Sequence, residues 1–410
     1  MSHVSVSASI VSCPSVPQRR IHSMHDCILH VGMPKTGTTA IQSSLFGSLR
    51  DKRFRLITLD SYFGNRTMSA AFMPTEFDRG SIFFRGVDPA RMSSVRATAT
   101  AYIDRSLRSA RRSGRVPIIS AEMVWMFSEE QLRTLASFLA TRGFRPRVYG
   151  YIRAPLDMLE SVFQQKIRVG RTEPWRELRR IMEGQPLRTR ISVFDDVFGE
   201  ASVDLRYFDP ECFPGRCVVM DFCERAGIEF DRDQVFRVNE SLNINAIKFL
   251  HAIGRHRIAQ GRSMPFSMTL MELLKWESLV HVLQRVPGPS LRLHSSLTSA
   301  FAESYRSEQP WLEKRLERSA PSTLAVRRND EGIRSEAELG SFDPAALDWL
   351  EAFTGERVGG DGQDPGVAAA VGAMLDRISI LRMPSVSVKV ARDRLRLKAR
   401  RRLMKSIRCL

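Results

Sequence analysis

The sequence lacks any long apolar run: no stretch of its 410 residues approaches the ~18 consecutive apolar residues that a membrane-spanning helix needs. The first 26 residues also lack the apolar core and small-residue cleavage site of a secretory signal peptide. We therefore expect a cytoplasmic protein without a spanning anchor, and a disordered leader at 1–26.

Cysteine is scarce, with six residues in the chain. Cys212, Cys217 and Cys223 lie close together, but their spacing matches no common zinc pattern and no histidine lies nearby. We expect reduced thiols and no bound metal.

Positive charge is in excess, with a formal net charge of +17. A basic body suits a polyanionic cofactor or an acidic substrate. Much of the excess lies in 385–410, where one helical face would be apolar and the rest rich in arginine. This basic amphipathic tail predicts peripheral contact with the inner membrane face, although a solvated or partner-bound tail would show the same pattern. We expect no nucleic-acid binding, because the tail has no aromatics and no known nucleic-acid-binding module accompanies it.

Short apolar runs alternate with helical patterns through the first half of the chain. Strands are predicted at 28–31, 54–58, 116–120, 147–152 and 203–208, and helices at 38–45, 90–112, 128–141, from 155 onward and at 218–227. The alternation predicts an α/β fold with a P-loop-type parallel β-sheet flanked by helices on both faces, and ligands bound at the carboxyl ends of the strands. The C-terminal half is predicted to be mainly helical, at 244–256, 268–286, 297–306, 345–353 and 368–381.

The chain divides into four predicted parts. After the leader comes an α/β domain at 27–320, then a linker with accessory helices at 321–384, and the tail at 385–410. Residues 60–90, rich in Gly, Pro, Asn, Phe and Met, are predicted to be a long loop beside the active site.

The stretch Cys27–Leu45 combines a buried strand, a glycine-bounded loop and a helix start. Free backbone N–H groups and the helix dipole meet there, so the loop suits an anionic group. In the common triphosphate loop, lysine follows the second glycine. Here Lys35 precedes Gly37, and Thr38-Thr39 stands where Lys-Ser would. This displacement argues against an ordinary ATPase or kinase.

The run Pro34-Lys35-Thr36-Gly37-Thr38-Thr39 resembles the 5′-phosphosulfate loop of the sulfotransferase family, whose donor is 3′-phosphoadenosine 5′-phosphosulfate (PAPS). A second segment, Arg153-Ala154-Pro155 at the end of a predicted strand with Ser161 eight residues after the arginine, resembles the family's 3′-phosphate-binding segment. The forked guanidinium of an arginine suits a phosphate, and so does a serine hydroxyl two helical turns further along the chain. The family usually has Arg-Asp-Pro at this place.

The resemblance implies a sulfotransferase that moves a sulfuryl group from PAPS to a hydroxyl or amine by in-line displacement. The acceptor it implies is a carbohydrate, a glycolipid or a related metabolite. Lys35 would neutralise the leaving phosphate. The cofactor would be held by Lys35, Thr36, Gly37, Thr38, Thr39, Arg153 and Ser161, without a metal.

The general base is less clearly marked. Family members use histidine or glutamate, and in many bacterial members the histidine follows a Gly-Asn pair. This chain has Gly64-Asn65-Arg66 there, and arginine cannot act as a base. We predict Glu122 as the base, because it lies just past a strand's carboxyl end, although a capping or salt-bridging carboxylate would look the same. Glu76 is a second candidate, and His30 is predicted to be a core histidine.

Two other functions stay open from the sequence. One is a P-loop nucleotide kinase-like enzyme. The other is a catalytically inactive sulfotransferase-fold protein that binds a membrane or a partner, because the Gly-Asn-His pattern is missing and Arg-Ala-Pro replaces Arg-Asp-Pro.

Overall fold

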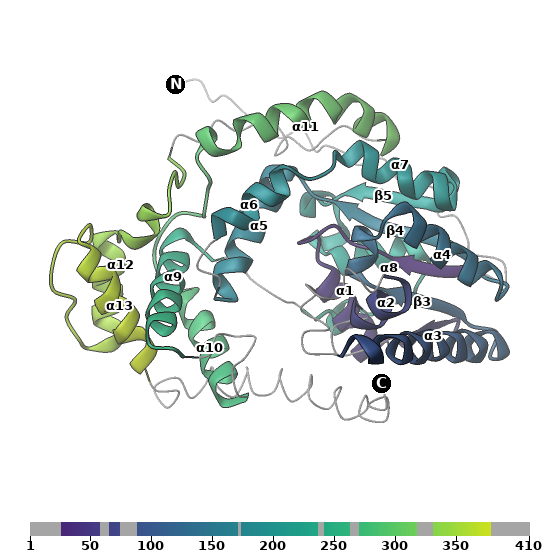
Figure 1. Ribbon diagram of the computed structural model, residues 1–410, viewed down its shortest axis with the longest axis horizontal. Coiled ribbons are helices and arrows are strands. Elements are labelled where there is room, and N and C mark those ends of the chain that lie inside the picture. Colours follow the sequence, from purple (N-terminus) through teal and green to yellow (C-terminus); the bar gives the residue numbers. More distant parts are fainter. Residues whose placement is uncertain are drawn as a thin grey trace, which may run out of the picture.

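A computed structural model describes residues 26–57, 65–73, 88–170, 174–236, 242–262, 270–317 and 331–378. Five parallel strands form one sheet in the order β2-β3-β1-β4-β5 (Figure 1). Their bounds are Asp26–His30 for β1, Phe54–Leu56 for β2, Val116–Ser120 for β3, Arg145–Ile152 for β4 and Val203–Tyr207 for β5. The protein is an α/β protein with a parallel sheet, as the sequence predicts.

The central strand β1 is buried along its whole length because helices cover both faces of the sheet. Side chains alternate between the two faces. Ile28 packs in one core cluster with residues of α1 (Thr38–Ser48) and α8 (Val218–Ala226). Leu29 packs in the other, with residues of α3 (Pro89–Arg112), α4 (Glu129–Ala140) and α7 (Leu187–Phe198).

The register of the sheet places the ends of β1 and β3 level with each other, while the neighbouring β4 continues to Ile152 at the same edge. His30, the last residue of β1, pairs with Ser120 of β3 on one side and with Tyr149 of β4 on the other. The residues that follow β1, β3 and β4 therefore leave the sheet at one carboxyl edge. This edge is where a ligand is expected in an open parallel sheet.

The C-terminal half is mainly helical, as predicted, and α5 (Pro155–Arg168) connects it to the sheet (Figure 1). The other helices are α6 (Pro174–Met182), α9 (Ile244–Ala259), α10 (Leu270–Leu283), α11 (Ser295–Arg315), α12 (Pro344–Thr354) and α13 (Pro365–Arg377). Helix α9 packs against α13 and α5. A buried carboxylate, Asp376 of α13, binds Arg257 of α9 at 2.7 Å and also binds Arg262.

The predicted loop at 60–90 is wrong in part. Helix α2, Asn65–Phe72, lies within it, and α3 begins at Pro89. Met68 and Phe72 of α2 are buried, and the small residues between them let α2 pack closely on α3. Residues 58–64 and 74–87 lie outside the described residues.

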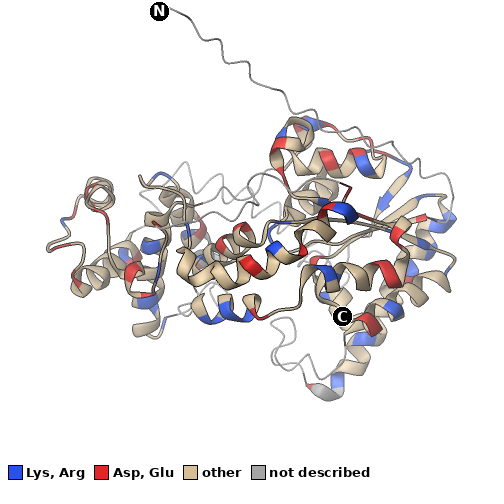
Figure 2. Cartoon of the chain, turned by 90° about the horizontal axis from the view of Figure 1, so that it is seen from above, with Lys and Arg blue, Asp and Glu red and all other residues tan. Residues whose placement is uncertain are grey.

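Helices α6 and α7 had no counterpart in the sequence-based prediction. Of the leader predicted at 1–26, residues 1–25 lie outside the described residues and Asp26 begins β1, and the basic tail at 385–410 also lies outside them. Within the described ranges, no helix is long and apolar enough to cross a membrane. Basic and acidic residues are interspersed over the helices rather than gathered into one field (Figure 2).

Candidate functional site

The loop between β1 and α1 is held in one conformation by its own residues. Gly37 precedes the first turn of α1 with a positive φ of 78°, and a Cβ there would lie 2.7 Å from Val218 Cγ1. Any other residue would meet both backbone strain and a steric clash. The Thr36 hydroxyl donates to the Met33 carbonyl at 2.7 Å. The loop is therefore a rigid cradle in front of the helix.

The backbone N–H groups at the N-terminus of α1 have no side-chain cap. Gly37 offers no side-chain cap, and the first turn holds no acidic residue. The Thr38 hydroxyl oxygen is buried and has no hydrogen-bond partner among the described residues. A Cβ at Gly32 would lie 2.2 Å from that oxygen, so the backbone passes close to it. Thr39, next in the helix, is half-buried. Such a terminus suits an anion.

Lys35 has a left-handed backbone, with φ of 69°, which is rare for a residue with a side chain. Among the described residues, its ammonium makes no hydrogen bond or ion pair. Burial lowers its pKa, and the nearby Arg153 and Arg168 lower it further, while Glu122 opposes them. An ammonium in such positive surroundings is stabilised by an added anion.

Arg153, at the end of β4, lies directly beside this loop. Its Nη1 donates to the Lys35 carbonyl oxygen at 2.6 Å, and its guanidinium lies over the Phe208 ring at 5.5 Å. Burial lowers its pKa, against the opposing charges of Asp157 and Glu160. The structure therefore brings together the two cations that the sequence placed 118 residues apart.

The acidic neighbours of Arg153 are themselves partly neutralised. Arg292, from the C-terminal half, donates to Glu160 at 2.6 Å and lies 4.0 Å from Asp157. Ser161, the next residue of α5, is half-buried, and its hydroxyl makes no hydrogen bond with the described residues. Arg153 and Ser161 thus follow β4 as the strand end and helix that the sequence predicts, and both keep donors available for a ligand.

Glu122 follows β3 and opens the short 3-10 helix η2, Glu122–Met126. Burial raises the pKa of its carboxyl, and Lys35 opposes this by a smaller amount. Among the described residues, no hydrogen bond or ion pair holds this carboxylate, so it is neither a helix cap nor a member of a salt bridge. The carboxylate and the Lys35 ammonium interact across the carboxyl edge of the sheet.

Asn65 is a site residue that the sequence reasoning missed. Its side-chain oxygen accepts a hydrogen bond from the Met123 N–H at 3.0 Å, which fastens the backbone just after Glu122 to α2. The Gly-Asn pair was a signal in the sequence, but it was considered only for a following histidine. Glu76 lies outside the described residues.

His30 is a core histidine, as predicted. Its Nδ1 lies 2.7 Å from the Ser120 hydroxyl, and its ring centroid lies 4.8 Å from that of Phe222. Burial, assisted by the charge of Arg225, lowers its pKa to about 3. The neutral ring therefore belongs to the packing between the sheet and α8.

Acidification from pH 6.5 to 5 is expected to destabilise the wild-type chain by about 1.5 kcal/mol more than a His30→Asn variant. The unfolded chain protonates His30 below its ordinary pKa of 6.5, whereas the folded chain does so only near 3. The unfolded state therefore binds more protons in this window, and stability falls as pH falls. Urea unfolding at both pH values measures the difference. Equal slopes for wild type and His30→Asn would contradict the expectation.

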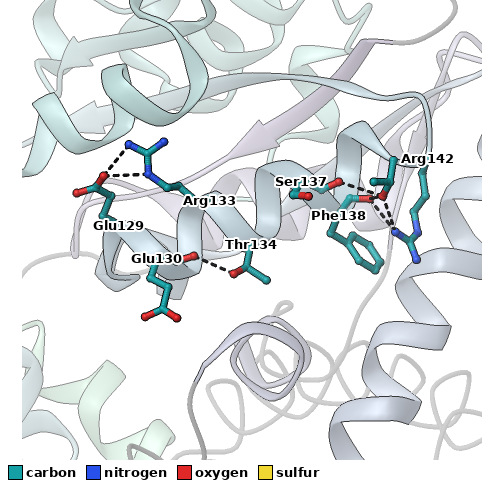
Figure 3. Close-up of a pocket in the computed structure, with 8 residues that line it drawn as sticks. Glu129, Glu130, Arg133, Thr134, Ser137, Phe138 and Arg142 are labelled. Carbon is teal, nitrogen blue, oxygen red and sulfur yellow. Dashed lines mark hydrogen bonds and ion pairs between the residues drawn. The ribbon is translucent and has the colours of Figure 1, made fainter.

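Two further features lie apart from this site. Among the described residues, no group of three or more His, Cys, Asp or Glu could hold a metal ion, and the described cysteines are free. A shallow groove runs along α4 and is lined by residues of that helix and its end (Figure 3). Its lining includes Phe138 with Arg142 3.5 Å from the ring centroid, and none of the loop residues.

Comparison with known proteins adds little. No family model matches the sequence, and no protein of curated function matches it. A solved structure titled as a sulfotransferase from Alicyclobacillus acidocaldarius matches with 13% identity and a TM-score of 0.36. The match covers 72% of this chain and 97% of the other. A likeness at this level does not assign a function to the chain.

Proposed function

We propose that the protein is a PAPS-dependent sulfotransferase. The observation that supports this most is the contact between Arg153 and the Lys35 carbonyl, because it puts two cations at one edge of the sheet, each with donors available. One is in a loop at a helix N-terminus and suits a 5′-phosphosulfate. The other is at a strand end beside Ser161 and suits a 3′-phosphate. A bisphosphorylated nucleotide has both groups.

The proposed reaction is an in-line displacement at sulfur. An acceptor hydroxyl or amine forms a new bond to sulfur, the bond from sulfur to the phosphate oxygen breaks, and the nucleotide bisphosphate leaves. Lys35 and the first N–H groups of α1 stabilise the charge that grows on the leaving phosphate. Glu122 takes the acceptor's proton, for which a carboxyl of raised pKa is better matched than an ordinary one.

The proposed acceptor is a carbohydrate, a glycolipid or a related hydroxyl-bearing metabolite, which approaches from the Glu122 side of Lys35. Peripheral membrane contact through the basic tail at 385–410 stays a prediction. The cytoplasmic location of the protein also stays a prediction.

Ligand-dependent thermal stabilisation tests the donor half of the proposal. Adenosine 3′,5′-bisphosphate at one hundred times its Kd is expected to stabilise the folded chain by about 2.7 kcal/mol. ATP with Mg²⁺ is expected to stabilise it far less, because no residue provides the lysine after the second glycine that a triphosphate loop uses. Equal or greater stabilisation by ATP with Mg²⁺ would favour the kinase-like alternative.

A further inference from the structure

Arg190, in the first turn of α7, is a half-buried cation that forms no ion pair with an acid among the described residues. Its Nη2 reaches the Val124 carbonyl at 3.4 Å, a long hydrogen bond. The guanidinium carbon lies 5.8 Å from the Trp125 ring centroid and 5.0 Å from that of Phe194. Its Nε is buried and has no hydrogen-bond partner among the described residues. Four of its five N–H donors thus meet no acceptor within the described part of the chain.

Several other partly or fully buried arginines reach a carboxylate, whereas Arg153, at the proposed donor site, does not. These pairs are Arg142 with Asp104 at 2.5 Å, Arg225 with Asp204 at 2.7 Å, Arg257 with Asp376 at 2.7 Å and Arg315 with Asp195 at 2.5 Å. At Arg190, burial lowers the pKa to about 10, and no nearby charge opposes it. Leaving a buried guanidinium donor unpaired costs free energy, which a bound anion would recover.

The position of α7 puts Arg190 beside the segment that begins with Glu122. Helix α7 ends at Phe198, shortly before β5 begins, so its first turns lie toward the carboxyl edge of the sheet. The carbonyl that Arg190 contacts belongs to η2, the 3-10 helix that begins with Glu122. Arg190 and Glu122 therefore both belong to the surroundings of the same short segment, Glu122 as its first residue and Arg190 through the Val124 carbonyl.

We propose that Arg190 binds an anionic group of the acceptor, such as a carboxylate or a sulfate, and so selects acidic acceptors over neutral ones. This inference rests on the proposed function, because it assigns the substrate class of the same site. The Trp125 and Phe194 rings hold the planar fork in place, and the unpaired donors bind the anion. The alternative is that the guanidinium serves only to pack between these rings.

Calorimetry on the full chain saturated with adenosine 3′,5′-bisphosphate separates these two roles. The probes are a uronic-acid disaccharide and its carboxyl-reduced form, which differ only in the charged group. Wild type is expected to bind the acidic form about tenfold more tightly, equivalent to about 1.4 kcal/mol. R190Q should abolish that preference. R188Q removes an exposed arginine of the same helix that lies over Trp311, and it should retain the preference.

R190K keeps the charge without the planar fork, and it is expected to show a preference between those of wild type and R190Q. If thermal unfolding shows that R190Q does not fold, R190K takes its place as the test variant. Full preference in R190Q or R190K, no preference in wild type, or binding of neither disaccharide by wild type would each overturn the inference. Failure of wild type to bind the bisphosphate would instead overturn the proposed function.

Discussion

Lys35→Ala is expected to lower kcat for sulfate transfer by about 10²–10³, the loss seen when one preorganised donor to a developing charge is removed. The Lys35 ammonium makes no hydrogen bond or ion pair with the described residues, and the positive groups around it raise the electrostatic potential at the place of the leaving phosphate. The effect should fall on kcat more than on KM, because the charge grows in the transition state.

Labelled PAPS and an extract of the protein's own cells provide the assay, with the sulfated product identified first. Lys52→Ala, which removes an exposed lysine, is the matched control and should retain full activity. Thermal unfolding should show that Lys35→Ala is folded. Full activity in this variant would remove Lys35 from the mechanism, whereas a wild type that sulfates no acceptor would support the inactive-protein alternative.

Glu122→Gln is expected to lower kcat by about 10²–10⁴, the usual contribution of a positioned general base. The variant should also change the pH profile. Wild-type kcat/KM should rise with pH as Glu122 loses its proton, and that rise should lie above the ordinary range of a carboxyl because burial raises the pKa. Below this pKa the protonated side chain cannot accept a proton, so the acidic limb belongs to Glu122 and should vanish in Glu122→Gln.

Glu129→Gln controls for the loss of a negative charge nearby in sequence, because Glu129 is exposed and pairs with Arg133 on α4. It should leave both the rate and the profile unchanged. If Glu122→Gln retains the wild-type rate and the acidic limb, the base lies elsewhere, and Glu76 is the next residue to replace.

The strands could be predicted because buried parallel strands are short apolar runs bounded by loops. The start of α4 was equally clear: Ser128 and Gln131 form the capping box that their spacing predicts. Helix α2 was missed because its 8 residues are too few for an apolar period to stand out within a stretch rich in Gly, Pro, Asn, Phe and Met. It folds because α3, η2 and α4 pack around it and bury the consecutive residues Thr67 to Phe72, which is tertiary information.

Some features of the candidate site could likewise be predicted from the sequence, and others could not. Lys35 and Arg153 could be placed at one edge of the sheet from their positions after two strands, but their direct contact could not. Arg190 gave no signal, because α7 was not predicted and an arginine in a sequence looks the same whether or not a carboxylate meets it in the fold. Asn65 matters through a hydrogen bond to the backbone 58 residues away, which no local pattern encodes.

The left-handed backbone at Lys35 implies a trade-off between stability and activity. A non-glycine residue in this conformation costs about 1–2 kcal/mol relative to glycine, and partial burial of its ammonium adds to that cost. A chain selected in the laboratory for heat resistance alone should therefore acquire glycine at this position and lose sulfate transfer as it becomes more stable. Thermostability screens that do not also select for turnover would favour the loss of the charge that the proposed reaction needs most.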